Sequence, residues 1–167
     1  MRGVEAEVIA TERLTLLPLA AQYAEEMAEV LGDSRLHDFI GGTPQTPQGL
    51  RARYERLVAG SGDAAVSWCN WVVRLESADC LTGTVQATVV GGRAEIAWVV
   101  GTPWQGQGIA TEAARGLVGW LCAQGVTTLV AHIHPDHLAS AAVAAGAGLT
   151  ATDEWDDGER RWRLIAG

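Results

Sequence analysis

Residues 94–114 read A-E-I-A-W-V-V-G-T-P-W-Q-G-Q-G-I-A-T-E-A-A, and this stretch decides the fold. A mostly apolar run over residues 93–100 is ended by a glycine, a threonine and a proline, which predicts a strand that stops there. Residues 107–123 carry alanines and leucines at helical spacing, so a helix is expected over them. Between the two elements lies a turn that contains Gly106 and Gly108. The segment is therefore predicted to be a strand, a glycine-rich turn and a helix.

The glycine-rich turn is a candidate anion site. Backbone N–H groups at a helix start have no partner within the helix, and the helix dipole favours anions there. Because Gly106 and Gly108 carry no side chain, a phosphate could approach these amides. In the alternative interpretation the glycines only relieve backbone strain. A Rossmann dinucleotide site is disfavoured, because Thr111 stands where its third glycine belongs and residues 126–130 lack its acidic residue.

The rest of the chain places strands and helices around this segment in the order β-αα-βββ-α-β-α-ββ. Strands are expected over residues 12–19, 68–76, 81–90, 93–100, 127–134, 149–154 and 160–165, and helices over 20–31, 46–58, 107–123 and 136–145. Short turns between the three middle strands predict an antiparallel meander. The fold class is therefore α/β (α+β), a mixed and mostly antiparallel twisted sheet of about seven strands with helices on both faces. Residues 1–167 are expected to form a single domain.

The charged residues exclude several functions. The chain has 20 acidic and 12 basic residues, a net charge of -8, so an amine is a more natural partner than nucleic acid. All of the basic residues are arginines. The lack of lysine excludes Walker-type phosphate loops, protein kinases and Schiff-base enzymes.

The cysteines and the apolar segments bear on the compartment. Cys69, Cys80 and Cys122 form no C-x-x-C pair, which favours a reducing environment. The first residues lack the pattern of a secretory signal, and no apolar stretch is typical of a membrane span. We therefore expect a cytoplasmic protein that has no membrane partner.

The glycine-rich turn resembles motif A of the GCN5-related N-acetyltransferases, the GNAT superfamily. That signature is Gln or Arg, two residues, Gly, one residue, then Gly or Ala, and residues 105–110 read Q-G-Q-G-I-A. The T-E-A that follows is similar to the ribosomal-protein N-terminal acetyltransferase subgroup. Residues 11–19, 81–85, 134–140 and 145–149 resemble further segments of that subgroup, in order. The resemblance covers nearly the whole chain and implies the GNAT fold.

The resemblance also implies an activity and a cosubstrate. The protein would move acetyl from acetyl-CoA to a primary amine by direct attack in a ternary complex, without a metal. Strand residues would pair with the pantetheine arm: Trp98, Val99 and Val100. The turn would hold the pyrophosphate: Gln105, Gly106, Gln107, Gly108, Ile109 and Ala110, with a hydroxyl from Thr111. His137 stands where asparagine is usual, which leaves its contact with pantetheine open.

Three residues are candidates for the proton transfers. Attack by an amine needs a base, and the resemblance implies Glu95 in that role and Ser140 as the acid near the CoA sulfur. Glu95 could instead be a strand residue that faces solvent, and Ser140 could cap a helix. His134 is the second candidate base, because histidine titrates near neutrality. The tyrosine that many relatives use as acid has no counterpart, since the only tyrosines are Tyr23 and Tyr54.

Two other interpretations compete with this one. His132, His134 and His137 lie in the string H-x-H-x-D-H, which resembles the dinuclear-metal motif of metallo-β-lactamase-type hydrolases and suggests a zinc hydrolase. That family needs further downstream ligands, and His137 is the last histidine, so we expect no metal. The protein could also bind CoA without catalysis. The acceptor, a small molecule or a protein N-terminus, stays open, as does a homodimer. The arginines at 160, 161 and 163 are typical of a solvated strand face.

Overall fold

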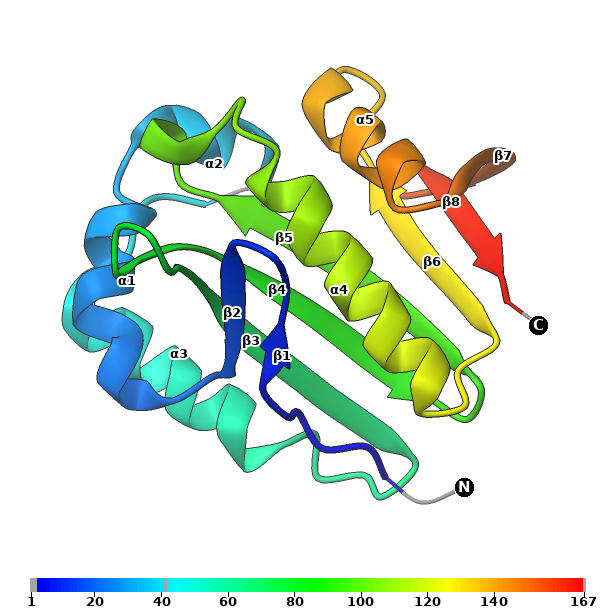
Figure 1. The fold of residues 1–167 in the computed structure, drawn as a ribbon, viewed down its shortest axis with the longest axis horizontal. Coiled ribbons are helices and arrows are strands. Elements are labelled where there is room, and N and C mark those ends of the chain that lie inside the picture. Colours follow the sequence, from blue (N-terminus) through cyan, green and yellow to red (C-terminus); the bar gives the residue numbers. More distant parts are fainter. Residues whose placement is uncertain (1–2, 41, 167) are drawn as a thin grey trace.

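The computed structural model describes residues 3–40 and 42–166 (Figure 1). Its strands are β1 Ile9–Ala10, β2 Leu14–Pro18, β3 Val66–Leu75, β4 Cys80–Val90, β5 Arg93–Val100, β6 Thr128–Ile133, β7 Thr150–Asp156 and β8 Glu159–Ile165. Its α-helices are α1 Ala24–Val30, α2 His37–Ile40, α3 Pro47–Ala59, α4 Ile109–Ala123 and α5 Leu138–Gly146. Short 3-10 turns cover Ala21–Tyr23, Ser34–Leu36 and Thr102–Trp104.

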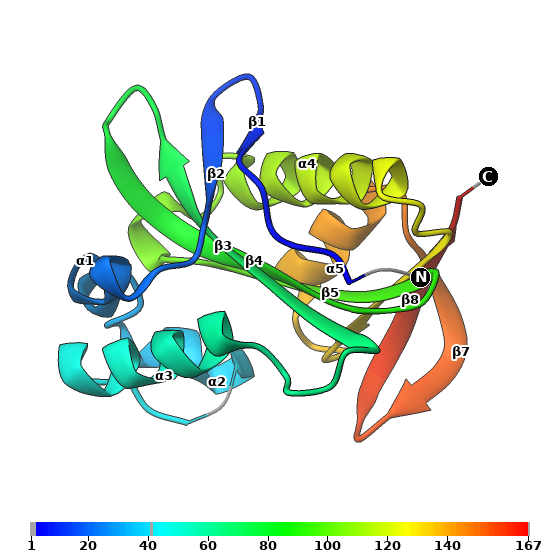
Figure 2. The ribbon, with the colours of Figure 1, turned by 90° about the horizontal axis from the view of Figure 1, so that it is seen from below.

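The strands of the described residues form one eight-stranded sheet in the order β1-β2-β3-β4-β5-β6-β8-β7. Every neighbouring pair is antiparallel except β5 and β6, which are parallel. Helices α1, α2 and α3 lie on one face, and α4 and α5 lie on the other (Figure 2). The predicted fold class is confirmed, with β1 as a strand beyond the expected seven.

The core has one layer on each face of the sheet. Helix α4 buries side chains that recur at helical spacing, among them Ile109, Ala113, Leu117 and Leu121, against the sheet. A smaller cluster under α1 and α3 includes the buried Met27. Burying each large apolar side chain contributes about 1.5–3 kcal/mol. The helices on both faces therefore hold the sheet in place.

Most predicted elements have the expected type, and the differences have local causes. Helix α4 begins at Ile109 and not at Gln107, because Gly106 and Gly108 have φ of 76° and 77°, which a right-handed helix does not accept. Helix α2 lies in a stretch that was expected to be a loop. No helix in the described part of the chain has the length and apolar character needed to cross a membrane.

Candidate active site

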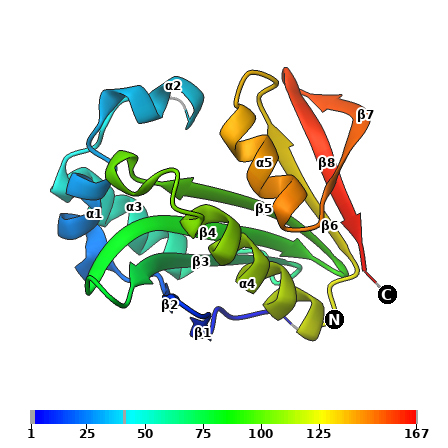
Figure 3. The same ribbon diagram turned by 45° about the horizontal axis from the view of Figure 1, so that its top comes forward.

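The sheet opens between β5 and β6. The two parallel strands pair only where residues 93–95 of β5 meet residues 128–130 of β6. Beyond that point β5 continues to Val100 and β6 to Ile133 without pairing with each other. The two strands diverge in Figure 3, and α5 is drawn over the gap between them. One edge of β5 is therefore left without a strand partner.

The free edge of β5 presents backbone groups of alternate residues. Gly101 N–H donates to Thr82 C=O over 2.8 Å on the β4 side. Backbone groups alternate between the two sides of a strand, so those of Trp98 and Val100 face the opening and those of Val99 face β4. Val100 C=O accepts from the Gln105 side chain over 3.0 Å, which agrees with this assignment. Trp98 and Val100 are thus positioned to pair with an extended ligand.

The glycine-rich turn has the shape of an anion cradle. Gly106 and Gly108 both adopt left-handed φ, and Gly108 is the N-cap of α4. A Cβ at Gly106 would meet nothing within 4 Å, so the space in front of this backbone is open. The open cradle precedes a helix of 15 residues, whose N-terminus favours an anion.

A brace behind the turn holds it in place. Arg13 donates to Gln107 C=O over 2.9 Å and to Glu112 Oε1 over 2.6 Å. Glu112 Oε2 accepts from Thr11 Oγ1 at 2.5 Å and from the Arg13 backbone N–H at 2.8 Å. Burial raises the pKa of Glu112, but these hydrogen bonds outweigh it and lower that pKa overall. Glu112 therefore acts as an anchor for the turn, a role that the motif alone did not suggest.

Thr111 and Ser140 connect the turn and β5 to α5. An ideal Cβ at Gly146 of α5 would lie 2.8 Å from Thr111 Cγ2, so the glycine allows α4 and α5 to approach closely. On the other side of α5, Ser140 Oγ accepts from the Trp98 indole N–H over 3.1 Å. The hydroxyl proton of Ser140 remains free to be donated elsewhere.

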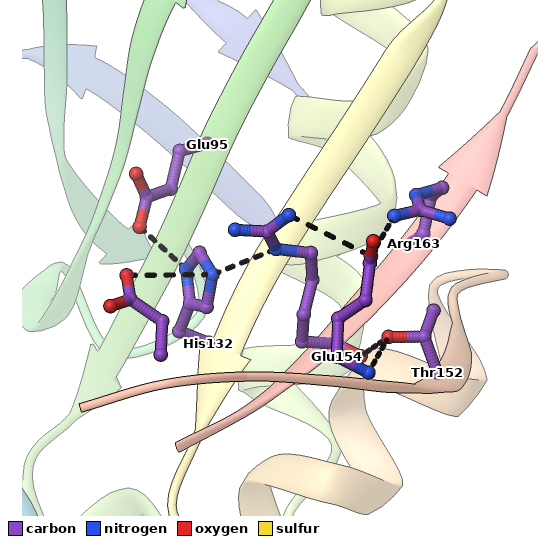
Figure 4. A network of polar contacts seen from close by, with 7 residues as sticks. Glu95, His132, Thr152, Glu154 and Arg163 are labelled. Atoms are coloured by element: carbon purple, nitrogen blue, oxygen red, sulfur yellow. Dashed lines mark hydrogen bonds and ion pairs between the residues drawn. The ribbon is translucent and has the colours of Figure 1, made fainter. Parts of the chain in front are cut away.

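Glu95 contacts a histidine on the neighbouring strand. Its Oε1 lies 2.7 Å from His132 Nδ1, and Arg161 Nε–H donates to His132 Nε2 over 3.1 Å. The His132 side chain is 10% exposed, whereas that of Glu95 is 57% exposed. Figure 4 shows Glu95 and His132 pointing toward each other from β5 and β6. Glu95 is therefore accessible to solvent and also oriented by a nearly buried ring.

The other two histidines lie beyond the end of β6. Asp136 N–H donates to His134 Nδ1 over 3.1 Å. Burial, together with the nearby His134, lowers the pKa of His137. Within residues 3–40 and 42–166, no three His, Cys, Asp or Glu side chains form a group that could hold a metal ion. The lone pair of His132 Nε2 already accepts from a guanidinium, which argues against the three histidines as zinc ligands.

A cavity of about 760 Å³ lies along the opening, and it extends over the face of the sheet that α3 covers. Predicted site residues that line it are Glu95, Trp98, Val99, His134, His137 and Ser140. Val100 and residues 105–111 are not among the described residues that line it. The cavity and the glycine turn are therefore two separate parts of the site.

The cavity is also lined by the polar side chains of Asn70, Gln86 and Tyr54 and by the charged Arg53 of α3. Asn70 on β3 is the cross-strand partner of Gln86 on β4, and Gln86 is the partner of Ala97 on β5. Ala97 lies two residues after Glu95, so Asn70 and Gln86 lie in the next row of the same cavity. Tyr54 on α3 is 4% exposed and also lines the cavity. Its hydroxyl is buried without a hydrogen-bond partner in the described structure, and burial raises the pKa of Tyr54 to about 12. The sequence signal for Asn70 and Gln86 was a polar residue within each apolar strand.

The chain matches the acetyltransferase (GNAT) domain family over residues 13–150. A search of the curated proteins finds no significant match. Three solved structures have similar folds. A GNAT-family acetyltransferase from Bacillus anthracis has a TM-score of 0.79 at 21% identity, covering 95% of this chain and 98% of that chain. RimL, a ribosomal-protein alpha-N-acetyltransferase in complex with coenzyme A, has a TM-score of 0.81 at 16% identity, covering 96% and 98%.

The third structure is the microcin self-immunity acetyltransferase MccE in complex with acetyl-CoA and AMP. Its TM-score is 0.76 at 19% identity, and 93% of each chain is covered. Identities this low show a shared fold, whereas the family match spans most of the sequence. The expected family is thereby confirmed. The chain belongs to the GNAT acetyltransferase family.

Proposed function

We propose that this protein transfers acetyl from acetyl-CoA to a primary amine bound in the cavity beside Glu95, and that residues 1–167 act as one acetyltransferase domain. The observation that carries this proposal is the position of Glu95, a solvent-accessible carboxylate held by His132 where the sheet opens. A carboxylate at this place can accept the proton that an ammonium must lose before it attacks.

The residues around the opening fit acetyl-CoA. The turn offers the pyrophosphate open space in front of Gly106 and leads into the N-terminus of α4, where an anion is favoured. The backbone groups of Trp98 and Val100 suit the amides of the pantetheine arm. Ile109, Ala110 and Thr111 form the first turn of α4 behind the cradle, and His137 and Val99 line the adjoining cavity.

The reaction needs a base, an oxyanion site and a leaving group. Glu95 takes a proton from the ammonium, directly or through water, and the neutral amine attacks the thioester carbonyl. A backbone N–H on the free edge of β5 stabilises the oxyanion as it develops. The nitrogen of the tetrahedral intermediate gives up its second proton to water. The carbon–sulfur bond breaks, and the CoA thiolate leaves with a proton from Ser140 or from water. His134 is the alternative base if Glu95 only binds the acceptor.

The acceptor is an amine-bearing molecule, either a protein N-terminus or a small molecule. The net charge of -8 attracts a cationic acceptor, and Glu95 and Glu159 both line the cavity. Asn70 and Gln86 could pair with a peptide-like extension. That RimL acts on a ribosomal protein favours a protein N-terminus as the first acceptor to test.

The cysteines support a place in the reducing cytoplasm. Cys69, Cys80 and Cys122 are all free thiols. A glutathione-rich compartment keeps thiols in this reduced form.

An amine panel tests the proposed function. The protein is incubated with acetyl-CoA and peptides with free N-termini, polyamines, amino acids or amine antibiotics, and released thiol is measured. Thiol release that depends on one amine class, with an acetylated product of the expected mass, supports the proposal. Tight CoA binding without transfer to any amine would instead support the non-catalytic interpretation.

A further inference from the structure

We propose that Arg161 is a positioning residue that holds His132 in its Nδ1–H tautomer and thereby orients the carboxylate of Glu95. This inference rests on the proposed function, in which Glu95 is the base. It assigns a role in the reaction to the terminal hairpin of β7 and β8, which carries Arg161 on β8.

The two contacts of His132 require the same tautomer. A guanidinium only donates hydrogen bonds, so His132 Nε2 must accept from Arg161 Nε–H at 3.1 Å. An ionised carboxylate only accepts, so His132 Nδ1–H must donate to Glu95 Oε1 at 2.7 Å. The ring is therefore neutral, with its proton on Nδ1 facing Glu95.

This tautomer decides which group can act as the base. The only ring lone pair of His132 lies on Nε2, where it already accepts a hydrogen bond from Arg161. The ring is also only 10% exposed, whereas Glu95 is 57% exposed. An ammonium in the cavity can therefore reach Glu95 more easily than His132. His132 acts through Glu95 by fixing where its carboxylate points.

Arg161 is itself held in place by the neighbouring strands. His132 and Arg161 are cross-strand partners in the β6 and β8 pairing. Arg161 Nη1 lies 3.6 Å from Glu154 Oε2 on β7, and Arg163 bonds the same oxygen. The backbone N–H of Glu154 donates to Thr152 Oγ1 over 3.2 Å, and this bond fixes Glu154 within the hairpin. Glu154, Arg163 and Thr152 form the outer end of the network in Figure 4.

Without Arg161, the ring proton of His132 is expected to be no longer fixed on Nδ1. Without the guanidinium, His132 Nε2 is free to carry the proton, and Nδ1 then loses its hydrogen bond to Glu95. The charged groups that face the ring are Glu95 from β5, Asp156 from β7 with Oδ2 at 4.0 Å, and Arg161 from β8.

Nitrogen-15 NMR of the histidine rings, assigned by His132→Gln, reads the tautomer without any substrate. Wild-type His132 should be neutral with the proton on Nδ1. In Arg161→Met the ring proton of His132 should shift from Nδ1 toward Nε2. This variant should also have a kcat about 10–100-fold lower than that of the wild type, with the Kd for acetyl-CoA unchanged. Arg161→Lys, which keeps a hydrogen-bond donor, should recover part of the Nδ1–H tautomer and part of the wild-type kcat. Arg74→Met is the matched control, because it removes an arginine of β3 whose partner is Glu76, just after the same strand and away from His132.

The outcomes separate this inference from the proposed function. Wild-type His132 with its proton on Nε2 would overturn the inference even if Arg161→Met does not fold. So would an Arg161→Met protein that keeps both the tautomer and kcat. If the wild type acetylates no amine, the proposed function fails, while the NMR measurement still decides the tautomer.

Discussion

The indole N–H of Trp98 donates to the hydroxyl oxygen of Ser140 over 3.1 Å, and this contact joins β5 to α5 across the opening of the sheet. Trp98 also presents its backbone groups to the same opening. The side chain of Trp98 therefore ties β5 to α5, and its backbone faces the opening in which the pantetheine arm is proposed to lie.

Ser140→Ala should lower kcat by about tenfold or less. The thiolate of CoA is a fair leaving group, so the loss of a proton donor costs little compared with the loss of the base. Trp98→Phe, which removes the indole N–H together with part of the ring system but leaves the Ser140 hydroxyl, is the control and should have a smaller effect. Steady-state kcat and kcat/KM, measured for both variants, separate chemistry from binding. A loss of more than a thousandfold in Ser140→Ala would make Ser140 an essential acid and contradict this assignment.

Acetyl-CoA should stabilise the fold through the glycine turn. Ligand at a hundred times its Kd adds about 2.7 kcal/mol to the free energy of unfolding. For a chain of this size each kcal/mol raises Tm by about 2–4 °C. Gly108→Asp should abolish the rise, because it adds a negative charge at the helix start where the pyrophosphate would bind. A Cβ at this position would lie 3.3 Å from Arg13 Nη2.

Gly108→Asn is the control for that variant. Asparagine accepts the left-handed backbone of Gly108 about as well as aspartate and carries no charge. Thermal unfolding with and without millimolar acetyl-CoA should show part of the stabilisation in Gly108→Asn and none in Gly108→Asp. An undiminished rise in Gly108→Asp would place the pyrophosphate elsewhere.

The brace on Glu112 should make stability depend on pH. Its folded pKa is lowered, so its contribution is fully present above the pKa of an unfolded glutamate, about 4.3, and is lost as the pH falls through the lower folded value. Glu112→Gln should therefore be less stable than the wild type by about 1–3 kcal/mol at pH 7. Urea unfolding from pH 7 to pH 3 should show this difference shrinking in acid. A constant difference over that range would contradict the brace.

Local patterns predicted the parts of the site that lie within single segments. The glycines at 106 and 108 identified the turn, because left-handed backbone and a helix start leave a local signature. The apolar periodicity of α4 and the short turns of the meander are local in the same way. These features required no knowledge of which strands are neighbours.

The contact between Glu95 and His132 was harder to predict because the two residues are distant in sequence. The strand expected over residues 127–134 includes both His132 and His134, but β6 ends at Ile133, and the ring that contacts Glu95 is that of His132. Arg161 lies in an arginine-rich run typical of a solvated face. Its contact with His132 follows from the pairing of β6 with β8, which the sequence alone does not reveal.

The central claim is that Glu95 removes the proton of the acceptor amine, and Glu95→Gln tests it most directly. Glutamine keeps the shape and can still accept from His132 Nδ1–H, but it cannot take a proton at neutral pH. With an amine from the panel, kcat should fall by about 10²–10⁴ while the Kd for acetyl-CoA stays the same. Glu76→Gln, on an exposed glutamate that follows β3, is the matched control and should retain wild-type kcat. A Glu95→Gln enzyme with wild-type turnover at every pH would contradict the account and leave His134 or solvent as the base.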